Sequence, residues 1–178
     1  MSVSDAPSLP IIGWRERVSL PDLSVSSIKA KIDTGARSSA IHAFDIELFK
    51  REGKEFVRFK VHPSQRSRKK VVLAEAKLLD MRKVRNSGGK AEMRPVVETI
   101  VSTINHQWPI ELTLTNRDVM GFRMLLGRQA VRKRFLVDPG QSYLQSPVLK
   151  RKLKGRKKTK HENSHFVEKF FTLFDASS

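Results

Sequence analysis

The fold is decided by residues 28–36, which read Ile28-Lys29-Ala30-Lys31-Ile32-Asp33-Thr34-Gly35-Ala36. Apolar and charged residues alternate as far as Ile32, which is typical of a strand with one buried face. Gly35 then permits a sharp backbone turn at low steric cost. The stretch therefore predicts a carboxylate, that of Asp33, held on a tight loop at the end of a strand.

The chemistry of such a loop calls for a second carboxylate. Two carboxylates about 3 Å apart cannot both ionise readily, so the pair would share one proton. The charged member would activate a water against an amide carbonyl, and the protonated member would donate to the carbonyl oxygen. Thr34 could lock two such loops together, because its hydroxyl both donates and accepts. The sequence has no second Asp-Thr-Gly or Asp-Ser-Gly, so we expect a homodimer with a two-fold axis through the site.

The rest of residues 10–145 reads mainly as short strands. Alternating or β-branched runs predict strands at 56–61, 71–74, 95–104, 108–115 and 135–137, with a hairpin turn at Asn105-His106-Gln107. Residues 128–134 are long enough for only two helical turns. Many short strands with one small helix indicate a mainly β fold, either a barrel or a sandwich.

Positive charge dominates the composition. The 178 residues include 35 Lys and Arg against 18 Asp and Glu, and the net charge of +17 usually indicates a polyanionic partner such as nucleic acid, ribosome, anionic membrane or acidic peptide. Eight positive charges lie between Lys150 and Lys160, which leaves +9 on the rest. We therefore expect a folded domain over residues 1–146. Residues 147–178 would form a basic, disordered tail with a short amphipathic helix at 166–174.

Two features of the sequence bear on location. The chain has no cysteine, which fits a reducing compartment. Its first twenty residues contain no apolar run typical of a signal peptide, and no stretch is long and apolar enough for a membrane helix. We expect a cytoplasmic protein without a membrane span.

Four features, taken in order, make the chain resemble the retropepsin-like aspartic peptidases. They are Asp33-Thr34-Gly35-Ala36, a glycine-rich flap at Asn86-Ser87-Gly88-Gly89, the hairpin at 95–115, and Leu125-Leu126-Gly127-Arg128 at the start of a helix. The resemblance implies a closed β-barrel with one short helix after Leu125-Leu126-Gly127. It also implies that Asp33, Thr34 and Gly35 form the catalytic loop.

More closely, the chain is similar to a bacterial family labelled ATP-dependent zinc proteases and associated with glutamate ligases of the ATP-grasp type. The matching stretches lie within residues 12–145 and are 14–16, 20–23, 29–37, 113–117 and 124–128. Membership implies an aspartic endopeptidase that trims glutamate tails added to a ribosomal protein by the partner ligase. The sequence has no His-Glu-x-x-His zinc motif and no Gly-x-x-x-x-Gly-Lys-[Ser/Thr] nucleotide loop, so we expect neither a metal nor a cofactor.

Arginines are favoured for binding a glutamate-rich peptide, because guanidinium groups grip carboxylates bidentately. With the residues of the loop and the flap, the candidate substrate-binding residues are Ala36, Arg37, Ser87, Gly88, Gly89, Arg94, Arg117 and Arg128. Three alternatives stay open. Arg37 close to Asp33 would disfavour the protonated carboxyl, Arg94 and Arg117 could form structural ion pairs, and residues 87–89 could be a plain hairpin turn.

The leading interpretation is a homodimeric aspartic peptidase for acidic peptides, because a basic domain would steer and hold a polyanionic chain. The alternative is a non-catalytic module of the same fold that binds ribosome or RNA through its basic surface and its tail between Lys150 and Lys160. Exposed-looking aromatic residues are scarce, with one tyrosine in the chain. This argues against a groove for single-stranded nucleic acid, which needs stacking faces.

Overall fold

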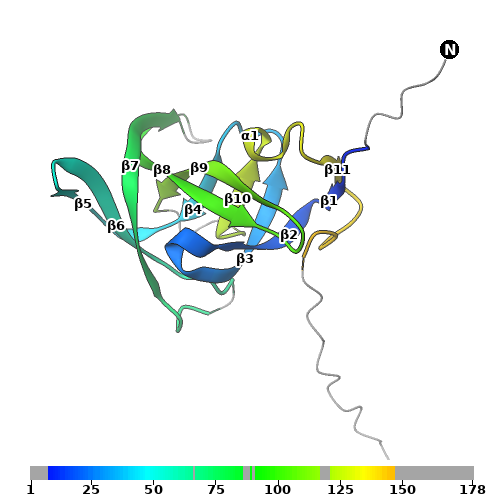
Figure 1. The fold of residues 1–178 in the computed structure, drawn as a ribbon, viewed down its shortest axis with the longest axis horizontal. Coiled ribbons are helices and arrows are strands. Elements are labelled where there is room, and N and C mark those ends of the chain that lie inside the picture. Colours follow the sequence, from blue (N-terminus) through cyan, green and yellow to red (C-terminus); the bar gives the residue numbers. More distant parts are fainter. Residues whose placement is uncertain (1–7, 66, 86–88, 90, 117–120, 147–178) are drawn as a thin grey trace, which may run out of the picture. The chain divides into compact units, whose positions relative to one another are not determined.

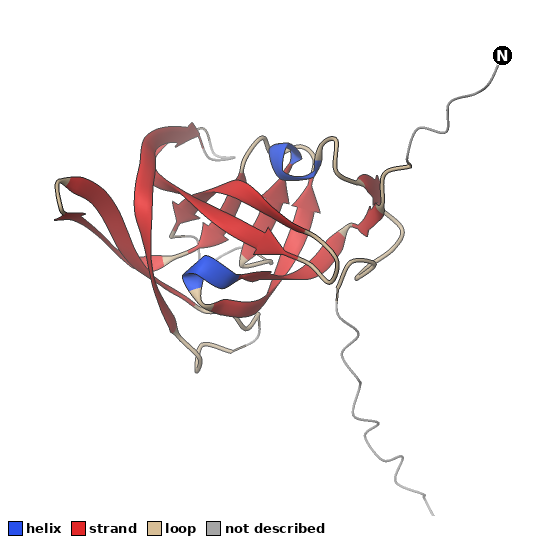
Figure 2. Cartoon of the chain, in the orientation of Figure 1, coloured by secondary structure: helices blue, strands red, loops and turns tan. Residues whose placement is uncertain are grey.

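The computed structural model describes residues 8–65, 67–85, 89, 91–116 and 121–146. Strands dominate these residues, with one short α-helix and one 3-10 turn (Figures 1 and 2). The strands are β1 (Ile11–Gly13), β2 (Arg15–Leu20), β3 (Val25–Asp33), β4 (Ser39–His42), β5 (Phe44–Arg51), β6 (Lys54–Val61), β7 (Val72–Arg85), β8 (Ala91–Ser102), β9 (Gln107–Thr115), β10 (Met124–Gly127) and β11 (Leu136–Asp138). The helical elements are η1 (Pro21–Leu23) and α1 (Arg128–Val131). The predicted mainly β class is confirmed.

One large sheet contains nine of these strands, in the order β2-β3-β10-β4-β9-β8-β7-β6-β5, and β1 pairs with β11 in a separate two-stranded sheet. β3 and β10 run parallel, as do β4 and β9. β2 also pairs with β8 at one position, where Ser19 lies opposite Ser102. The parallel pairing of β3 with β10 positions the site, because it brings the carboxyl ends of two strands together.

The core is built from alternate residues of these strands. Ile28, Ala30 and Ile32 on β3 are buried, as the alternation in the sequence predicts. They belong to one hydrophobic cluster that also contains Leu112 of β9 and Leu126 of β10. Full burial of a leucine or isoleucine side chain contributes about 1.5–3 kcal/mol. The cluster therefore fixes the strands whose ends carry the loop after Asp33.

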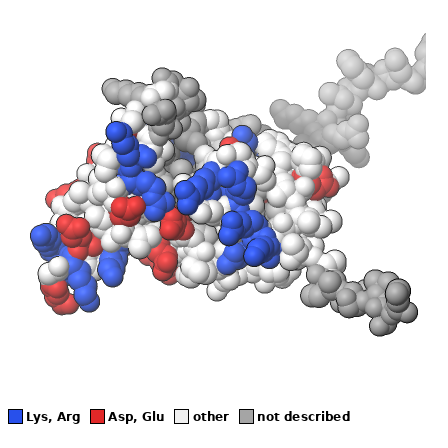
Figure 3. Space-filling model, turned by 90° about the horizontal axis from the view of Figure 1, so that it is seen from above, with Lys and Arg blue, Asp and Glu red and all other residues white. Residues whose placement is uncertain are grey.

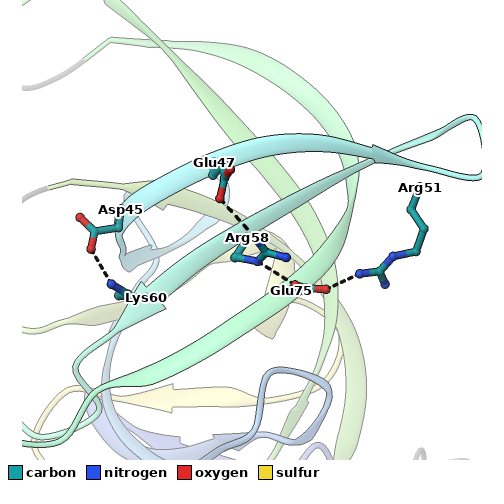
Figure 4. Close-up of polar contacts among 6 residues, drawn as sticks. All are labelled: Asp45, Glu47, Arg51, Arg58, Lys60 and Glu75. Atoms are coloured by element: carbon teal, nitrogen blue, oxygen red, sulfur yellow. Dashed lines mark hydrogen bonds and ion pairs between the residues drawn. The ribbon is translucent and has the colours of Figure 1, made fainter.

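The outer strands β5, β6 and β7 carry a ladder of ion pairs across their exposed side chains (Figure 4). Its contacts are Asp45 with Lys60 (2.9 Å), Glu47 with Arg58 (3.4 Å), Glu75 with Arg58 (2.8 Å) and Glu75 with Arg51 (2.7 Å). Exposed pairs of this kind stabilise by less than about 1 kcal/mol each. Their main consequence is that the cations of these pairs, Arg51, Arg58 and Lys60, are already neutralised.

Several elements differ from the sequence prediction. β7 has 14 residues, far more than the predicted strand at 71–74, because it forms a long antiparallel hairpin with β8. β1, β2, β4, β5 and β10 were not predicted as strands. α1 has four residues instead of two turns, because Arg132 is extended (ψ 140°) and Lys133 has a φ of 60°.

The predicted tail and its helix fall on residues 147–178, which lie outside the described residues. The boundary after residue 146 therefore stays a prediction. Within the part of the chain that the structure describes, no helix is long and apolar enough to cross a membrane.

Candidate active site

Asp33 is the last residue of β3, and the turn that follows fixes its carboxylate. The backbone N–H of Ala36 donates to Asp33 Oδ1 and to the Asp33 carbonyl, both at 3.2 Å. Lys31 Nζ lies 3.3 Å from Asp33 Oδ2, and the Asp33 side chain is 30% exposed. The carboxylate is therefore oriented from one side and accessible from the other.

Gly127 lets the loop after Asp33 approach β10 closely. The parallel pairing places Gly127 in register with Asp33. A Cβ at Gly127 would lie 2.5 Å from the carbonyl carbon and oxygen of Ser38, closer than any side chain can stand. The N–H of Gly127 also donates to Ser39 Oγ at 3.2 Å. Only glycine allows these two segments to touch in this way.

Helix α1 holds the same loop from the other side. The N–H of Arg128 donates to the Ala36 carbonyl (2.8 Å), and that of Gln129 donates to the Arg37 carbonyl (3.1 Å). The Arg128 guanidinium donates through Nη1 to the Thr34 carbonyl at 2.9 Å. The Leu-Leu-Gly-Arg stretch thus positions the Asp-Thr-Gly-Ala loop through both its backbone and its arginine.

Asp33 opens onto a pocket of about 350 Å³. Its walls include Trp14, Lys31, Phe122 and Leu125. Trp14 and Phe122 meet edge to face, with ring centroids 5.8 Å apart. Among the described residues that line this pocket, Asp33 is the only carboxylate. The described part of one chain therefore supplies a single carboxylate to this pocket.

Thr34 and Gly35, predicted as catalytic-loop residues, are both exposed beside Asp33. Gly35 does not have a positive φ, and an added Cβ would stand 3.4 Å from Asp33 Oδ1. Its small size therefore keeps space next to the carboxylate. Arg37 is exposed, and the ion-pair partner that the structure gives Asp33 is Lys31. Ala36 acts through its backbone N–H.

The other predicted substrate-binding residues lie apart from this loop or outside the described residues. Arg94 is 7% exposed, and its guanidinium pairs with Glu92 at 2.9 Å, which is the structural alternative that the sequence left open. Gly89 has a φ of +81° in the connection between β7 and β8. Ser87, Gly88 and Arg117 are not described, so a flap over the site stays a prediction.

Sequence reasoning missed most of the pocket. Lys31 could have been found, because it precedes Asp33 by two residues and so shares its face of the strand. Trp14 is half-buried and lines the pocket, a role that no pattern in the sequence indicates. Leu125 belongs to the Leu-Leu-Gly-Arg stretch, but neither that stretch nor Phe122, just before β10, indicates a place in this pocket. The pairing of β10 with β3 brings both residues there.

The sequence model of the family described as "RimB-like: Retropepsin-like aspartic endopeptidase RimB" matches residues 11–148. The chain belongs to this RimB-like family. The match includes both the Asp33 loop and the Gly127 turn that supports it. The predicted relationship to retropepsin-like aspartic peptidases is therefore confirmed.

The relatives that match the chain are longer proteins, and they are named as ligases rather than as peptidases. A "Probable alpha-L-glutamate ligase" of Shewanella halifaxensis is 49% identical over 133 residues, which is 75% of this chain and 29% of that protein. A protein of the same name from Desulfotalea psychrophila is 45% identical over 152 residues, 85% of this chain and 32% of its own length. This RimB-like chain thus spans about a third of the curated relatives that it matches.

A solved structure shows a similar fold. The crystal structure of a Legionella pneumophila protein of unknown function superimposes with a TM-score of 0.67 at 28% sequence identity. The match covers 78% of this chain and all of that protein.

Proposed function

We propose that this RimB-like chain is a homodimeric aspartic peptidase that cleaves acidic, glutamate-rich peptides. The observation that carries the proposal is the Asp33 carboxylate, which is oriented by Ala36, partly exposed, and open to a pocket. Family membership supports this assignment, because the matched region contains the loop and the turn that supports it.

The proposed mechanism uses one Asp33 from each of two chains. Brought close together across a two-fold axis, the two carboxyls would hold one proton between them. The ionised carboxylate would take a proton from water as the water attacks the scissile carbonyl carbon. The protonated carboxyl would donate to the carbonyl oxygen, and collapse of the tetrahedral intermediate would release the amine. Thr34, exposed beside Asp33, is available to bind the partner loop.

The charge of the domain supports an acidic substrate. Figure 3 views the end of the domain that carries α1 and shows Lys and Arg side chains gathered near the middle of this face, with Asp and Glu side chains beside them. Exposed cations in and just after α1 include Arg128, Arg132, Lys133 and Arg134. A cationic surface of this kind concentrates a polyanionic peptide and speeds its association.

The names of the relatives support a ligase as the functional partner. Each of these proteins is called a probable alpha-L-glutamate ligase and contains a region that resembles this chain. A ligase that adds glutamates and a peptidase that removes them act on the same product. We therefore propose that the substrate is a glutamate tail, added by an ATP-grasp ligase to a ribosomal protein.

The proposal also includes a closed barrel as the scaffold and the cytoplasm as the site of action. β2, β3, β10, β4, β9 and β8 pair in succession, and the pairing of Ser19 with Ser102 links β8 back to β2. These pairings support the closed barrel expected from the resemblance. The cysteine-free composition supports a cytoplasmic site of action.

The test is cleavage of a glutamate-tailed peptide by wild type and by Asp33→Asn, which keeps the size of the side chain and removes its acid–base function. The matched control is Asp80→Asn, at an exposed aspartate of β7 paired with Arg82. We expect cleavage by wild type and Asp80→Asn and none by Asp33→Asn. Equal cleavage by all three would exclude the aspartic mechanism.

The second candidate is a catalytically inactive module that binds ribosome or RNA. It is favoured by the net charge of +17 and the basic block between Lys150 and Lys160. Absence of cleavage, together with ribosome binding that is lost when residues 147–178 are removed, would favour it over the peptidase.

A further inference from the structure

Like charges face each other directly on the outer side of β2 and β3. The antiparallel register places Arg15 opposite Lys31 and Arg17 opposite Lys29. The residues between them, such as Glu16 and Ala30, point inward and are buried. Like charges in directly opposed positions of a sheet are destabilising. The fold alone therefore does not explain why four cations are placed here.

The described residues neutralise little of this charge. Lys31 pairs with Asp33 at 3.3 Å. The Arg15 guanidinium lies over the rings of Trp14 (4.5 Å) and Tyr143 (5.3 Å). In the part of the chain that the structure describes, Arg17 and Lys29 have no ion-pair partner. The contrast with the ion-pair ladder on β5–β7 is plain, since every cation drawn there meets a carboxylate (Figure 4).

The charged face leads directly to the carboxylate of the candidate site. Lys29, Lys31 and Asp33 alternate with buried residues, so their side chains lie on the same face of β3. Four residues of strand span about 13 Å at about 3.3 Å per residue. An extended peptide bound at Asp33 would therefore reach Lys29 within about four residues.

A second hollow of about 580 Å³ continues this face. It is lined by three cations, Arg17, Lys29 and Lys70, and by polar residues that include Ser26, Ser64 and Gln65. None of the described residues that line it is acidic. Positive charge and hydrogen-bonding groups without a carboxylate make a site for an anion.

Gln65 connects this hollow to the pocket of Asp33. Its Nε2 donates to the Gly121 carbonyl at 2.6 Å, and its Oε1 accepts from the N–H of Arg123 at 3.2 Å. Gly121 and Phe122 line the Asp33 pocket. The hydrogen bond from Gln65 to Gly121 thus links the linings of the two hollows on one side. On the other side β3 links them, because Lys29 lines the second hollow and Lys31 lines the Asp33 pocket.

We propose that Arg17, Lys29, Lys31 and Lys70 form a track that binds the glutamate side chains on one side of the scissile bond. The inference rests on the proposed function and specifies how the substrate is recognised. The track would make affinity depend on the length of the acidic tail, because only a tail of about four or more residues reaches the second hollow.

An acidic peptide fits this track better than a nucleic acid does. The track starts at the Asp33 pocket, where a peptide bond would be cleaved. Of the aromatic residues near it, Trp14 and Tyr143 lie against the Arg15 guanidinium, and Phe122 packs edge to face with Trp14. Bases would therefore find little free surface for stacking.

The test measures binding to full-length protein carrying Asp33→Asn, so that no peptide is cleaved. The probes are two fluorescent peptides. One has about two glutamates and is too short to reach the second hollow, and the other has about eight and reaches it. The track variant adds Lys29→Gln and Lys70→Gln. The matched control adds Lys50→Gln and Lys54→Gln, which remove the same charge from exposed positions on β5 and β6.

We expect the track variant to bind the longer peptide about fivefold more weakly, since each exposed ion pair contributes up to about fivefold. The shorter peptide should bind all proteins alike, and the control should match Asp33→Asn alone. Equal weakening by track and control variants would overturn the proposal. The proposal would also be overturned if the track variant lost more affinity for an oligonucleotide of equal charge than for the longer peptide. That result would assign the surface to nucleic acid.

The binding test of the track and the cleavage test of the proposed function can succeed or fail independently. If the longer peptide shows the expected contrast while the wild type cleaves no peptide, the track stands and the peptidase assignment fails. If the wild type cleaves the peptide and the contrast is absent, the peptidase stands and the track is wrong.

Discussion

Gly127 of β10 lies in register with Asp33 of β3, and the backbone at Ser38 crosses so close to Gly127 that no side chain fits there. A sheet pairing and a loop crossing thus meet at one residue. The position of the candidate catalytic carboxylate depends on this contact, although Gly127 is 94 residues away in the sequence.

Gly127→Ala should therefore damage both stability and the site. A Cβ placed 2.5 Å from Ser38 must displace the loop, and strain of this kind costs about 1–3 kcal/mol or more. We expect a lower urea midpoint and loss of peptide cleavage. Gly121→Ala is the matched control for stability, because an added Cβ at Gly121 meets nothing within 4 Å. If both variants have the wild-type urea midpoint, the backbone at Ser38 leaves room for a Cβ at Gly127.

A second prediction concerns the buried carboxylate of Glu16, which fastens the segment before residue 147 to β2. Glu16 is fully buried. Its Oε1 accepts from the N–H groups of Gly13 and Leu144, both at 2.9 Å. Its Oε2 accepts from the N–H of Gln145 at 3.2 Å and from the Ser146 hydroxyl. The carboxylate is thus surrounded by donors.

Glu16→Gln replaces one acceptor oxygen with a donor that faces these N–H and O–H groups. Each donor left without an acceptor costs about 1–3 kcal/mol, so we expect at least about 2 kcal/mol of destabilisation. Urea unfolding followed by tryptophan fluorescence measures it. Glu98→Gln, at an exposed position on β8, should change stability by less than about 0.5 kcal/mol. Similar midpoints for the two variants would show that Glu16 is not a fastening point.

A third prediction follows from the ion-pair ladder. Hydrogen bonds from Arg58 and then Arg51 lower the pKa of Glu75 below its ordinary value of 4.5. Because the folded state favours the ionised form, Glu75 contributes stability above pH 4.5 that is lost as pH falls through its folded-state pKa. Glu75→Gln should therefore lose less stability than wild type on acidification.

Urea midpoints of wild type and Glu75→Gln, compared at neutral pH and below pH 4.5, test this. The difference should be small, because the group is exposed to solvent. It should shrink as the pH falls. A difference that stays constant across this range would mean that the ion pairs do not set the titration of Glu75.

How far the sequence predicts this molecule depends on the range of the interactions. The alternation at 28–32 predicted β3 and its buried face, and the Leu-Leu-Gly-Arg stretch predicted the start of the short helix α1. β5 could not be predicted in the same way, because most of its residues are at least partly exposed on both faces. The contact between Gly127 and Ser38 joins distant segments and has no local signal.

The arginines show the same limit. Arg37, Arg94 and Arg128 look alike in the sequence, yet Arg94 is buried against Glu92 and Arg128 holds the Thr34 carbonyl. Only three-dimensional neighbours separate them. The cations opposed on β2 and β3 could have been found by pairing the two strands in register, but the register itself depends on the fold.

The final prediction tests whether one active site needs two Asp33 carboxylates. Wild-type chains are mixed with an equal amount of Asp33→Asn chains and left to exchange partners. If the site forms across a two-fold axis, half of the wild-type chains then pair with an inactive partner, and activity per wild-type chain falls to about half. Cleavage of a glutamate-tailed peptide measures it, and co-purification of wild-type chains with affinity-tagged Asp33→Asn chains confirms that the two kinds of chain associate. Asp80→Asn chains are expected to be active themselves. Mixing with them should therefore leave the activity per wild-type chain unchanged or raise the total activity of the mixture. Unchanged activity in the Asp33→Asn mixture, with exchange demonstrated, would mean that a single chain carries a complete site.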